Sequence, residues 1–184
     1  MKRARLALLV LVTMLALVGA GCGGDDESAT GAAPADWAEG FCTAITTWTD
    51  ELQQIGDSAG DPSSLDVDSL KQAAEDVGTA TDSFVDELRE LGAPDTESGQ
   101  AVEDSLESLA DTLESEQSDI EQAVDDVSGL TGVPTAIAAL GTSLTAMGTA
   151  LQEALDAIES ADAANELETA LENSEACDDF PGSG

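Results

Sequence analysis

The sequence contains no histidine, and its 184 residues include only five lysines and arginines against 39 aspartates and glutamates. Without histidine the chain cannot build a Ser-His-Asp triad, a Cys-His nucleophile pair or a Glu-x-x-His di-iron site. Affinity for nucleic acid comes largely from lysine and arginine, which displace counterions from phosphates. A formal net charge of −34 therefore excludes nucleic acid as a partner.

The sequence also lacks the usual phosphate-binding and metal-binding motifs. No glycine-rich loop is followed by lysine and then serine or threonine, which is the pattern of a P-loop. The acidic run 61–68 lacks the aspartate spacing, the glycine and the closing glutamate of an EF-hand. Among enzymes, a hydrolase with paired carboxylates stays open. We expect a noncatalytic protein without a cofactor or a defined metal site.

The first 22 residues have the features of an export signal. A basic start is followed by an apolar run over 6–18 and by small residues immediately before Cys22; the basic residues are Lys2, Arg3 and Arg5. The apolar run is shorter than the ~20 residues that a transmembrane helix needs. This order of features predicts a signal peptide over residues 1–21.

The run Val18-Gly19-Ala20-Gly21-Cys22 resembles the lipobox of bacterial lipoproteins, with Gly19 where that family prefers leucine. The resemblance implies that Cys22 is acylated, becomes the new N-terminus and anchors the protein in the cell membrane on the extracytoplasmic face. Two or more acyl chains are enough for stable anchoring. An ordinary secretory signal with an incidental cysteine is the alternative. The start of the chain and its composition are similar to those of small lipoproteins from actinobacteria.

Residues 22–34 are rich in glycine, alanine and acidic residues and have no apolar period, so they read as a flexible tether. The folded domain is expected over residues 35–180. Outside the membrane Cys42 and Cys177 are predicted to form a disulfide, because thiols are oxidised there. Two free buried thiols are the alternative. The bridge would close a loop of about 135 residues, which the chain-entropy model values at close to 5 kcal/mol.

Four segments show the apolar spacing of amphipathic helices: 35–55, 66–91, 96–128 and a segment that opens at Pro134. A weak stretch over 160–165 allows the last segment to form either one helix or two. We predict an all-α fold, an antiparallel up-down-up-down four-helix bundle. This topology brings the start of the first helix and the end of the fourth to the same end, where Cys42 and Cys177 can meet.

Several residues allow two interpretations. The stripe of Trp37, Phe41 and Trp48 fits a buried core or a platform for a sugar or an apolar ligand. Glu116 occupies a position in segment 96–128 where the helical spacing predicts an apolar residue, and it is expected to be solvated.

Two glycines and a possible cap concern the helices themselves. Gly141 and Gly148 weaken the fourth helix unless they allow close helix contact. An Asp36–Glu39 capping box is expected to start the first helix and Gly56 to end it.

We therefore expect a lipid-anchored, noncatalytic interaction or binding module of the cell envelope. The alternative is a lipoprotein that binds a small ligand or a divalent cation. Expected partners are the membrane, through the anchor on Cys22, and either cations or an envelope protein. The sequence predicts no oligomeric state.

Overall fold

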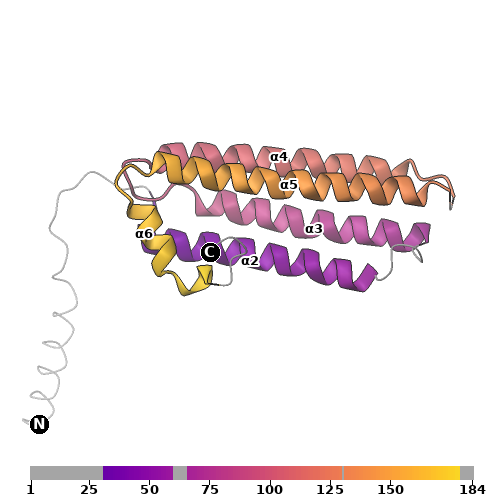
Figure 1. Ribbon diagram of the computed structural model, residues 1–184, viewed down its shortest axis with the longest axis horizontal. Helices are drawn as coiled ribbons and strands as arrows, with labels where there is room; N and C mark the ends of the chain where they lie inside the picture. Colours follow the sequence, from indigo (N-terminus) through magenta and orange to yellow (C-terminus); the bar gives the residue numbers. More distant parts are fainter. Residues whose placement is uncertain (1–30, 60–65, 130, 179–184) are drawn as a thin grey trace, which may run out of the picture.

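The computed structural model describes residues 31–59, 66–129 and 131–178, which form an all-α helical bundle without strands (Figure 1). The predicted all-α helical bundle is thus confirmed. Four long helices lie side by side: α2 (Pro34–Ala59), α3 (Val67–Leu91), α4 (Gly99–Asp125) and α5 (Val133–Ala161). They are followed by the short helix α6 (Glu166–Asn173) and the 3-10 turn η2 (Glu175–Cys177). None of the described helices is long and apolar enough to cross a membrane.

The predicted signal peptide, the predicted lipid site Cys22 and most of the tether lie outside the described residues. Export and acylation of Cys22 therefore stay predictions. The described part begins just before α2, at Gly31, and ends just after η2, at Asp178.

The ends of α2 differ from the expectation. The helix begins at Pro34, because the Trp37 amide already donates to the Ala33 carbonyl at 2.8 Å. Asp36 and Glu39 consequently lie inside the first turns and form no capping box. Proline suits the first turn of a helix, where its fixed φ angle is helical and its missing N–H costs nothing. The helix also continues through Gly56 to Ala59.

The ends of α3 follow local rules that the sequence displays. Asp66 caps the helix, and its Oδ1 accepts a hydrogen bond from the Ser69 amide at 2.8 Å. This bond favours the charged carboxylate and lowers the pKa of Asp66. Gly92 ends the helix with a φ angle of 59°, a conformation that residues with a Cβ rarely adopt.

The aromatic stripe of α2 is part of the core, as the first interpretation predicted. Trp37 and Phe41 are fully buried, and their rings stack with centroids 4.9 Å apart. Trp48 stacks on Phe84 of α3 at 4.8 Å. Trp37 Nε1 donates to the Gly92 carbonyl at 3.0 Å, so this buried indole keeps a hydrogen-bond partner. The platform interpretation is not supported, because these ring faces are covered.

The position where the apolar pattern of α4 is interrupted is less exposed to solvent than expected. Glu116 is half-buried, and so is its neighbour Gln117. Gln117 packs against Gly78 of α3, where an added Cβ would lie 3.2 Å from the amide nitrogen of Gln117. The stripe resumes at Ile120 and continues at Val124, which is buried, whereas Ala123 is half-buried. The polar pair Glu116–Gln117 thus lies at the edge of the α3–α4 interface.

The fourth segment forms two helices, with the break between Ala161 and Glu166. Asn165 there has a left-handed backbone, with a φ angle of 54°. Buried Asp162 accepts hydrogen bonds from the amides of Glu166, Leu167 and Glu168 at 3.1, 2.8 and 2.9 Å. One carboxylate therefore satisfies the first amides of α6, which otherwise have no partner.

Candidate functional site

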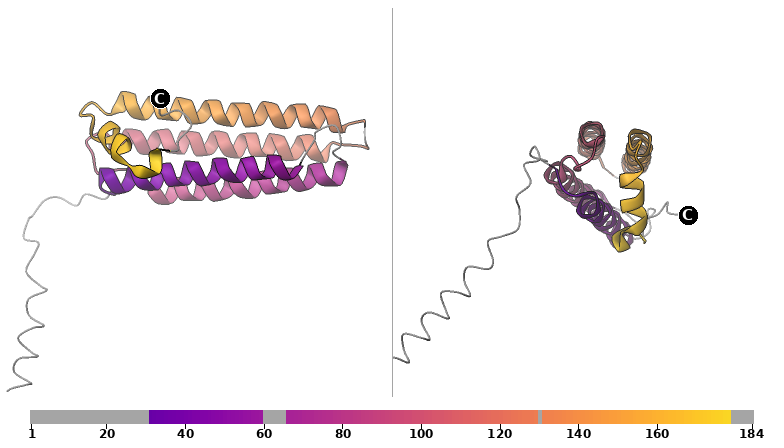
Figure 2. Two further views of the ribbon diagram at one scale, coloured as in Figure 1. Left: turned by 60° about the horizontal axis from the view of Figure 1, so that its bottom comes forward. Right: turned by 90° about the vertical axis from the view of Figure 1, so that its left-hand side faces the viewer.

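On one side of the bundle the two neighbouring long helices, α2 and α5, do not pack against each other. The pairs α2–α3, α3–α4 and α4–α5 pack along their lengths, whereas α2 and α5 make little or no backbone contact. At one end α6 lies between α2 and α5 (Figure 2), and both α6 and η2 contact α2. We call this side of the bundle the α2–α5 side.

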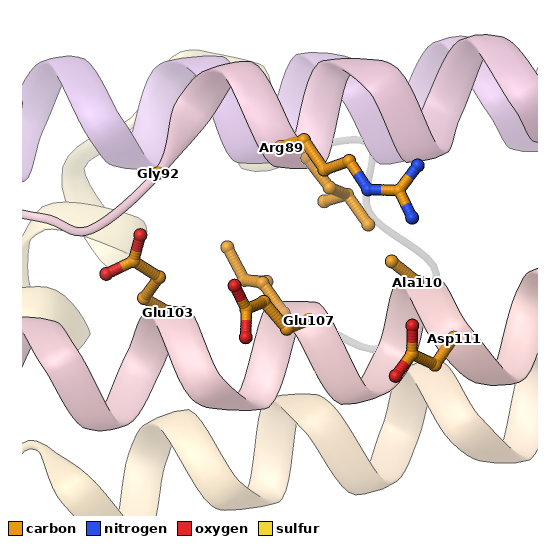
Figure 3. A pocket seen from close by; sticks show the side chains of 8 residues that line it. Arg89, Gly92, Glu103, Glu107, Ala110 and Asp111 are labelled. Carbon is orange, nitrogen blue, oxygen red and sulfur yellow. The ribbon is translucent and has the colours of Figure 1, made fainter.

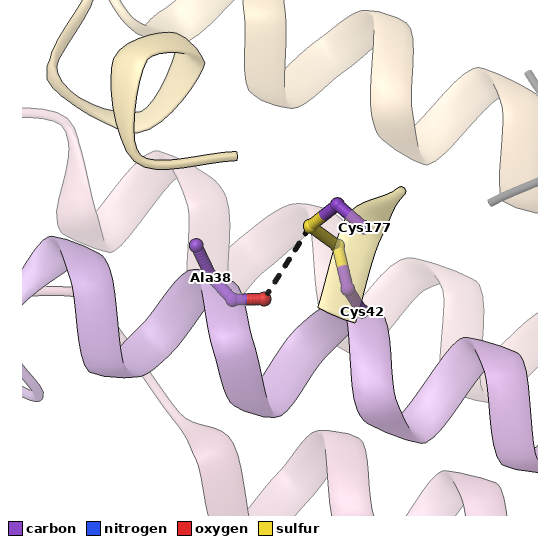
Figure 4. The surroundings of a disulfide bond; sticks show 3 residues. All are labelled: Ala38, Cys42 and Cys177. Atoms are coloured by element: carbon purple, nitrogen blue, oxygen red, sulfur yellow. Dashed lines mark hydrogen bonds between the residues drawn. A yellow bond between two sulfur atoms is a disulfide. The ribbon is translucent and has the colours of Figure 1, made fainter. Parts of the chain in front are cut away.

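Two features hold α6 and η2 against α2. Leu167 on α6 is fully buried. The predicted disulfide is present, with the sulfur atoms of Cys42 and Cys177 2.00 Å apart and the Cα atoms 5.1 Å apart (Figure 4). The Cys177 sulfur also lies 3.9 Å from the Ala38 carbonyl oxygen. This is a packing contact, because a disulfide sulfur has no hydrogen to donate.

A small pocket lies beside the disulfide, where α2, α5, α6 and η2 meet. Its volume is about 220 Å³, and its lining residues are Phe41, Cys42, Leu155, Leu171, Glu172, Cys177 and Asp178. Phe41 and both cysteines are buried, whereas Leu155 and Leu171 are half-buried. The two carboxylates are exposed and lie at the rim. The pocket can therefore hold an apolar group with its polar end facing the solvent.

The part of α5 beyond the pocket has an unusual surface for such an acidic chain. No charged side chain occurs from Val133 to Gln152. The exposed hydroxyls of Thr142, Thr145 and Thr149 donate to carbonyls of their own helix at 2.9, 2.7 and 2.9 Å. These threonines therefore present mainly methyl groups to the solvent.

The glycines of α5 do not provide the close helix contact considered above. A Cβ added at Gly141 or Gly148 would meet no atom within 4 Å. Both glycines are exposed, and three apolar side chains around Gly141 are half-buried: Ile137, Leu140 and Leu144. An uncharged strip of α5 is therefore open to a partner.

A second, larger pocket of about 380 Å³ lies between α3 and α4 (Figure 3). Charged groups surround it, with Arg89 on α3 facing Glu103, Glu107 and Asp111 on α4. Arg89 Nη2 forms a 2.8 Å ion pair with Glu114, and both side chains are about half exposed, at 48% and 46%. Four of the eight residues that line this pocket are charged, against two of the seven beside the disulfide. It is therefore the weaker candidate for binding an apolar group.

The described residues contain no group of three or more acidic or cysteine side chains placed to hold a metal ion. Asp66, the part of the acidic run 61–68 nearest to α3, is used as a helix cap. Residues 61–65 of that run lie outside the described ranges. No observation here favours a divalent-cation site.

The end of α2 contains a serine in a stretch that resembles a hydrolase motif. Residues 56–60 read Gly-Asp-Ser-Ala-Gly, which matches the letters of the G-x-S-x-G nucleophile pattern. That pattern requires a sharp turn between a strand and a helix, together with a histidine. Ser58 is instead exposed in the last turn of α2, and the chain has no histidine. The match is therefore coincidental.

The pocket beside the disulfide was not predicted. Leu155 and Leu171 follow the helical period, so the sequence placed them in the core with the other apolar residues. Their half-burial depends on where α6 turns back, which no local pattern reveals. Comparison with known proteins adds no further site, because no family model matches the chain and no curated protein or solved structure is significantly similar to it.

Proposed function

We propose that this protein is a noncatalytic binding module of the cell envelope, anchored by lipid on Cys22 at the extracytoplasmic face of the membrane. The α2–α5 side carries the proposal. Ile137, Leu144 and Leu155 are half-buried and share one face of α5, and Leu155 lines the pocket on this side. The helix carries no charge from Val133 to Gln152, in a chain whose net charge is −34. Apolar surfaces left open on a folded domain often mark interaction sites.

The disulfide supports the extracytoplasmic location. Paired structural cysteines are typical of oxidising compartments and rare in the cytoplasm. Cys42 and Cys177 are paired with each other, which leaves Cys22 as the remaining cysteine for the lipid. The predicted tether is shorter than residues 22–34, because Ala32 pairs with Pro94 and its carbonyl accepts a hydrogen bond from the Asp95 amide at 2.7 Å. The stretch from Cys22 to Gly31 can span roughly 30 Å when extended. The bundle can therefore work at some distance from the bilayer surface.

Anchoring is tested by membrane fractionation. We expect the natural chain to sediment with membranes and Cys22→Ser to appear in the soluble extracytoplasmic or secreted fraction. Cys42→Ser is the matched control, because it removes a cysteine without touching the lipid site. Equal membrane association of all three chains would contradict anchoring through Cys22.

The binding role is tested by placing a photo-crosslinking amino acid at Thr145, on the uncharged strip of α5. The control position is Ser83 on α3, which is also exposed and also donates to its own helix, at 3.0 Å. In the native cells we expect a discrete crosslinked product from position 145 and none from position 83. The same products from both positions, or none from either, would contradict an interaction on the α2–α5 side.

A second function, binding of a small ligand, is favoured by the pocket beside the disulfide. Its accessible apolar lining is Leu155 and Leu171, whereas Phe41 and the Cys42–Cys177 bridge at the pocket are buried. The two functions are compatible, because the pocket lies at the end of the α2–α5 side that α6 covers.

A further inference from the structure

We propose that the pocket beside the disulfide binds a small organic cation, an alkyl or aryl group that carries a protonated amine. The inference rests on the small-ligand function above and names the ligand class. It is independent of lipid anchoring and of crosslinking at position 145, so it can fail while those proposals stand.

The apolar part of the ligand is set by the walls and size of the pocket. Phe41, Leu155, Leu171 and the disulfide leave about 220 Å³. An engineered protein cavity of about 150 Å³ with apolar walls binds benzene. One aromatic ring or a short alkyl group therefore fits this pocket, whereas a large cofactor does not.

The charge of the ligand is set by the rim. Glu172 and Asp178 line the pocket and are exposed. In the described ranges the only cationic side chains are Lys71 and Arg89, neither lines this pocket, and Arg89 is paired with Glu114. An ammonium group bound at this pocket is attracted by both exposed carboxylates. An anionic ligand of the same shape would be repelled by the rim.

The other charged side chains of α6 and η2 are also negative. α6 also carries Glu166 and Glu168, and η2 carries Glu175. The local potential therefore attracts a cation toward the mouth of the pocket, since no described basic side chain of α6 or η2 opposes it. The apolar walls then select an organic cation over a hydrated metal ion, because metal ions need several oxygen ligands.

The test uses the full chain with Cys22→Ser, which prevents acylation, and leucine methyl groups labelled for NMR. Three probes share a phenyl ring and differ in charge: 2-phenylethylammonium, 2-phenylethanol and 3-phenylpropionate. We expect the ammonium probe to shift the methyl signals of Leu155 and Leu171 saturably and to leave buried Leu109 unchanged. The alcohol should bind more weakly, and the carboxylate most weakly.

Glu172→Gln should weaken binding of the ammonium probe about two- to fivefold, the range expected for one exposed ion pair. Glu168→Gln is the matched control, because it removes the same charge from the same helix outside the pocket lining, and it should leave the affinity unchanged. Equal binding of the three probes would overturn the role of the rim charge. The same conclusion would follow if Glu172→Gln and Glu168→Gln weakened binding of the ammonium probe equally. Absence of any shift at Leu155 and Leu171 would overturn the pocket itself.

The chain's own C-terminal segment is the competing occupant. Deleting residues 179–184 should leave the Leu155 and Leu171 signals unchanged and the ammonium affinity intact. If the deletion alone shifts these signals, and the probe binds only after it, the segment fills the pocket and the proposal is wrong.

Discussion

Gly141 and Gly148 allow a prediction at the scale of single residues. Neither would bring an added Cβ within 4 Å of another atom, and glycine inside a helix costs about 0.5–1 kcal/mol relative to alanine. Gly141→Ala and Gly148→Ala should therefore each raise the free energy of unfolding by about 0.5–1 kcal/mol in urea titrations.

Gly78→Ala is the control for these two variants. Its Cβ would lie 3.2 Å from the Gln117 amide nitrogen, so crowding should cancel part or all of the helical gain. If all three variants are stabilised equally, open space around the α5 glycines is not what distinguishes them. If Gly148→Ala also removes the crosslink expected at position 145, the glycine surface is used for contact.

The Glu116–Gln117 pair shows where prediction from single residues stops. The apolar period of α4 correctly places Leu113 and Ile120 in the core, because side chains at this spacing share one helix face. The environment of Glu116 depends on the neighbouring helix as well. Gly78 of α3 leaves room for Gln117, and nothing within the α4 sequence indicates this.

At the scale of elements, the position of α6 depends on Asp162. Its carboxylate accepts the amides of Glu166, Leu167 and Glu168. Loss of a helix cap costs about 0.5–2 kcal/mol, so Asp162→Ala should lower the free energy of unfolding by that amount. Amide hydrogen exchange should speed up in α6 more than in α3.

Asp156→Ala is the matched control, because this exposed aspartate lies in the body of α5. It should change the free energy of unfolding by less than about 0.5 kcal/mol. An equal loss in both variants would show that overall charge, and not capping, sets the effect of residue 162.

The disulfide gives a second prediction for the same region. In an oxidising buffer, and on the Cys22→Ser background, Cys42→Ser and Cys177→Ser should each lower the melting temperature by a similar amount. The double variant should add little, because each single change already breaks the one bridge between Cys42 and Cys177. A reductant should lower the melting temperature of the parent chain and not that of the double variant. Additive losses would contradict the pairing.

Local rules predicted most helix ends but not the arrangement of α2, α5 and α6. Asp66, Gly92 and Pro134 mark helix ends by their own chemistry, and the weak stretch at 160–165 marked the break. The spacing of apolar residues indicates which face of a helix is buried, but it does not indicate which neighbouring helix covers that face. The sequence therefore predicted a four-helix bundle but not that the short helix α6 would take the place of a long contact between α2 and α5 at one end.

At the scale of the whole molecule, charge and the open side act together. A net charge of −34 opposes compaction through self-repulsion, and the open α2–α5 side removes one of the helix–helix contacts that would offset it. The same charge favours basic partners over acidic ones. Stability and binding should therefore both depend on ionic strength, and in opposite directions, because salt screens the self-repulsion and also screens attraction to a basic partner.

The stability of the bundle should increase with ionic strength, because salt screens the repulsion among its acidic residues. The melting temperature, followed by circular dichroism, should rise between low salt and about 0.1 M ionic strength, where the Debye length falls to about 10 Å. NaCl and CaCl₂ at matched ionic strength should give similar values if the acidic residues form a solvated surface. A calcium site filled at 100 times its Kd would add about 2.7 kcal/mol. That is about 5–11 °C for a domain of this size, so an excess this large in CaCl₂ would establish the divalent-cation function instead.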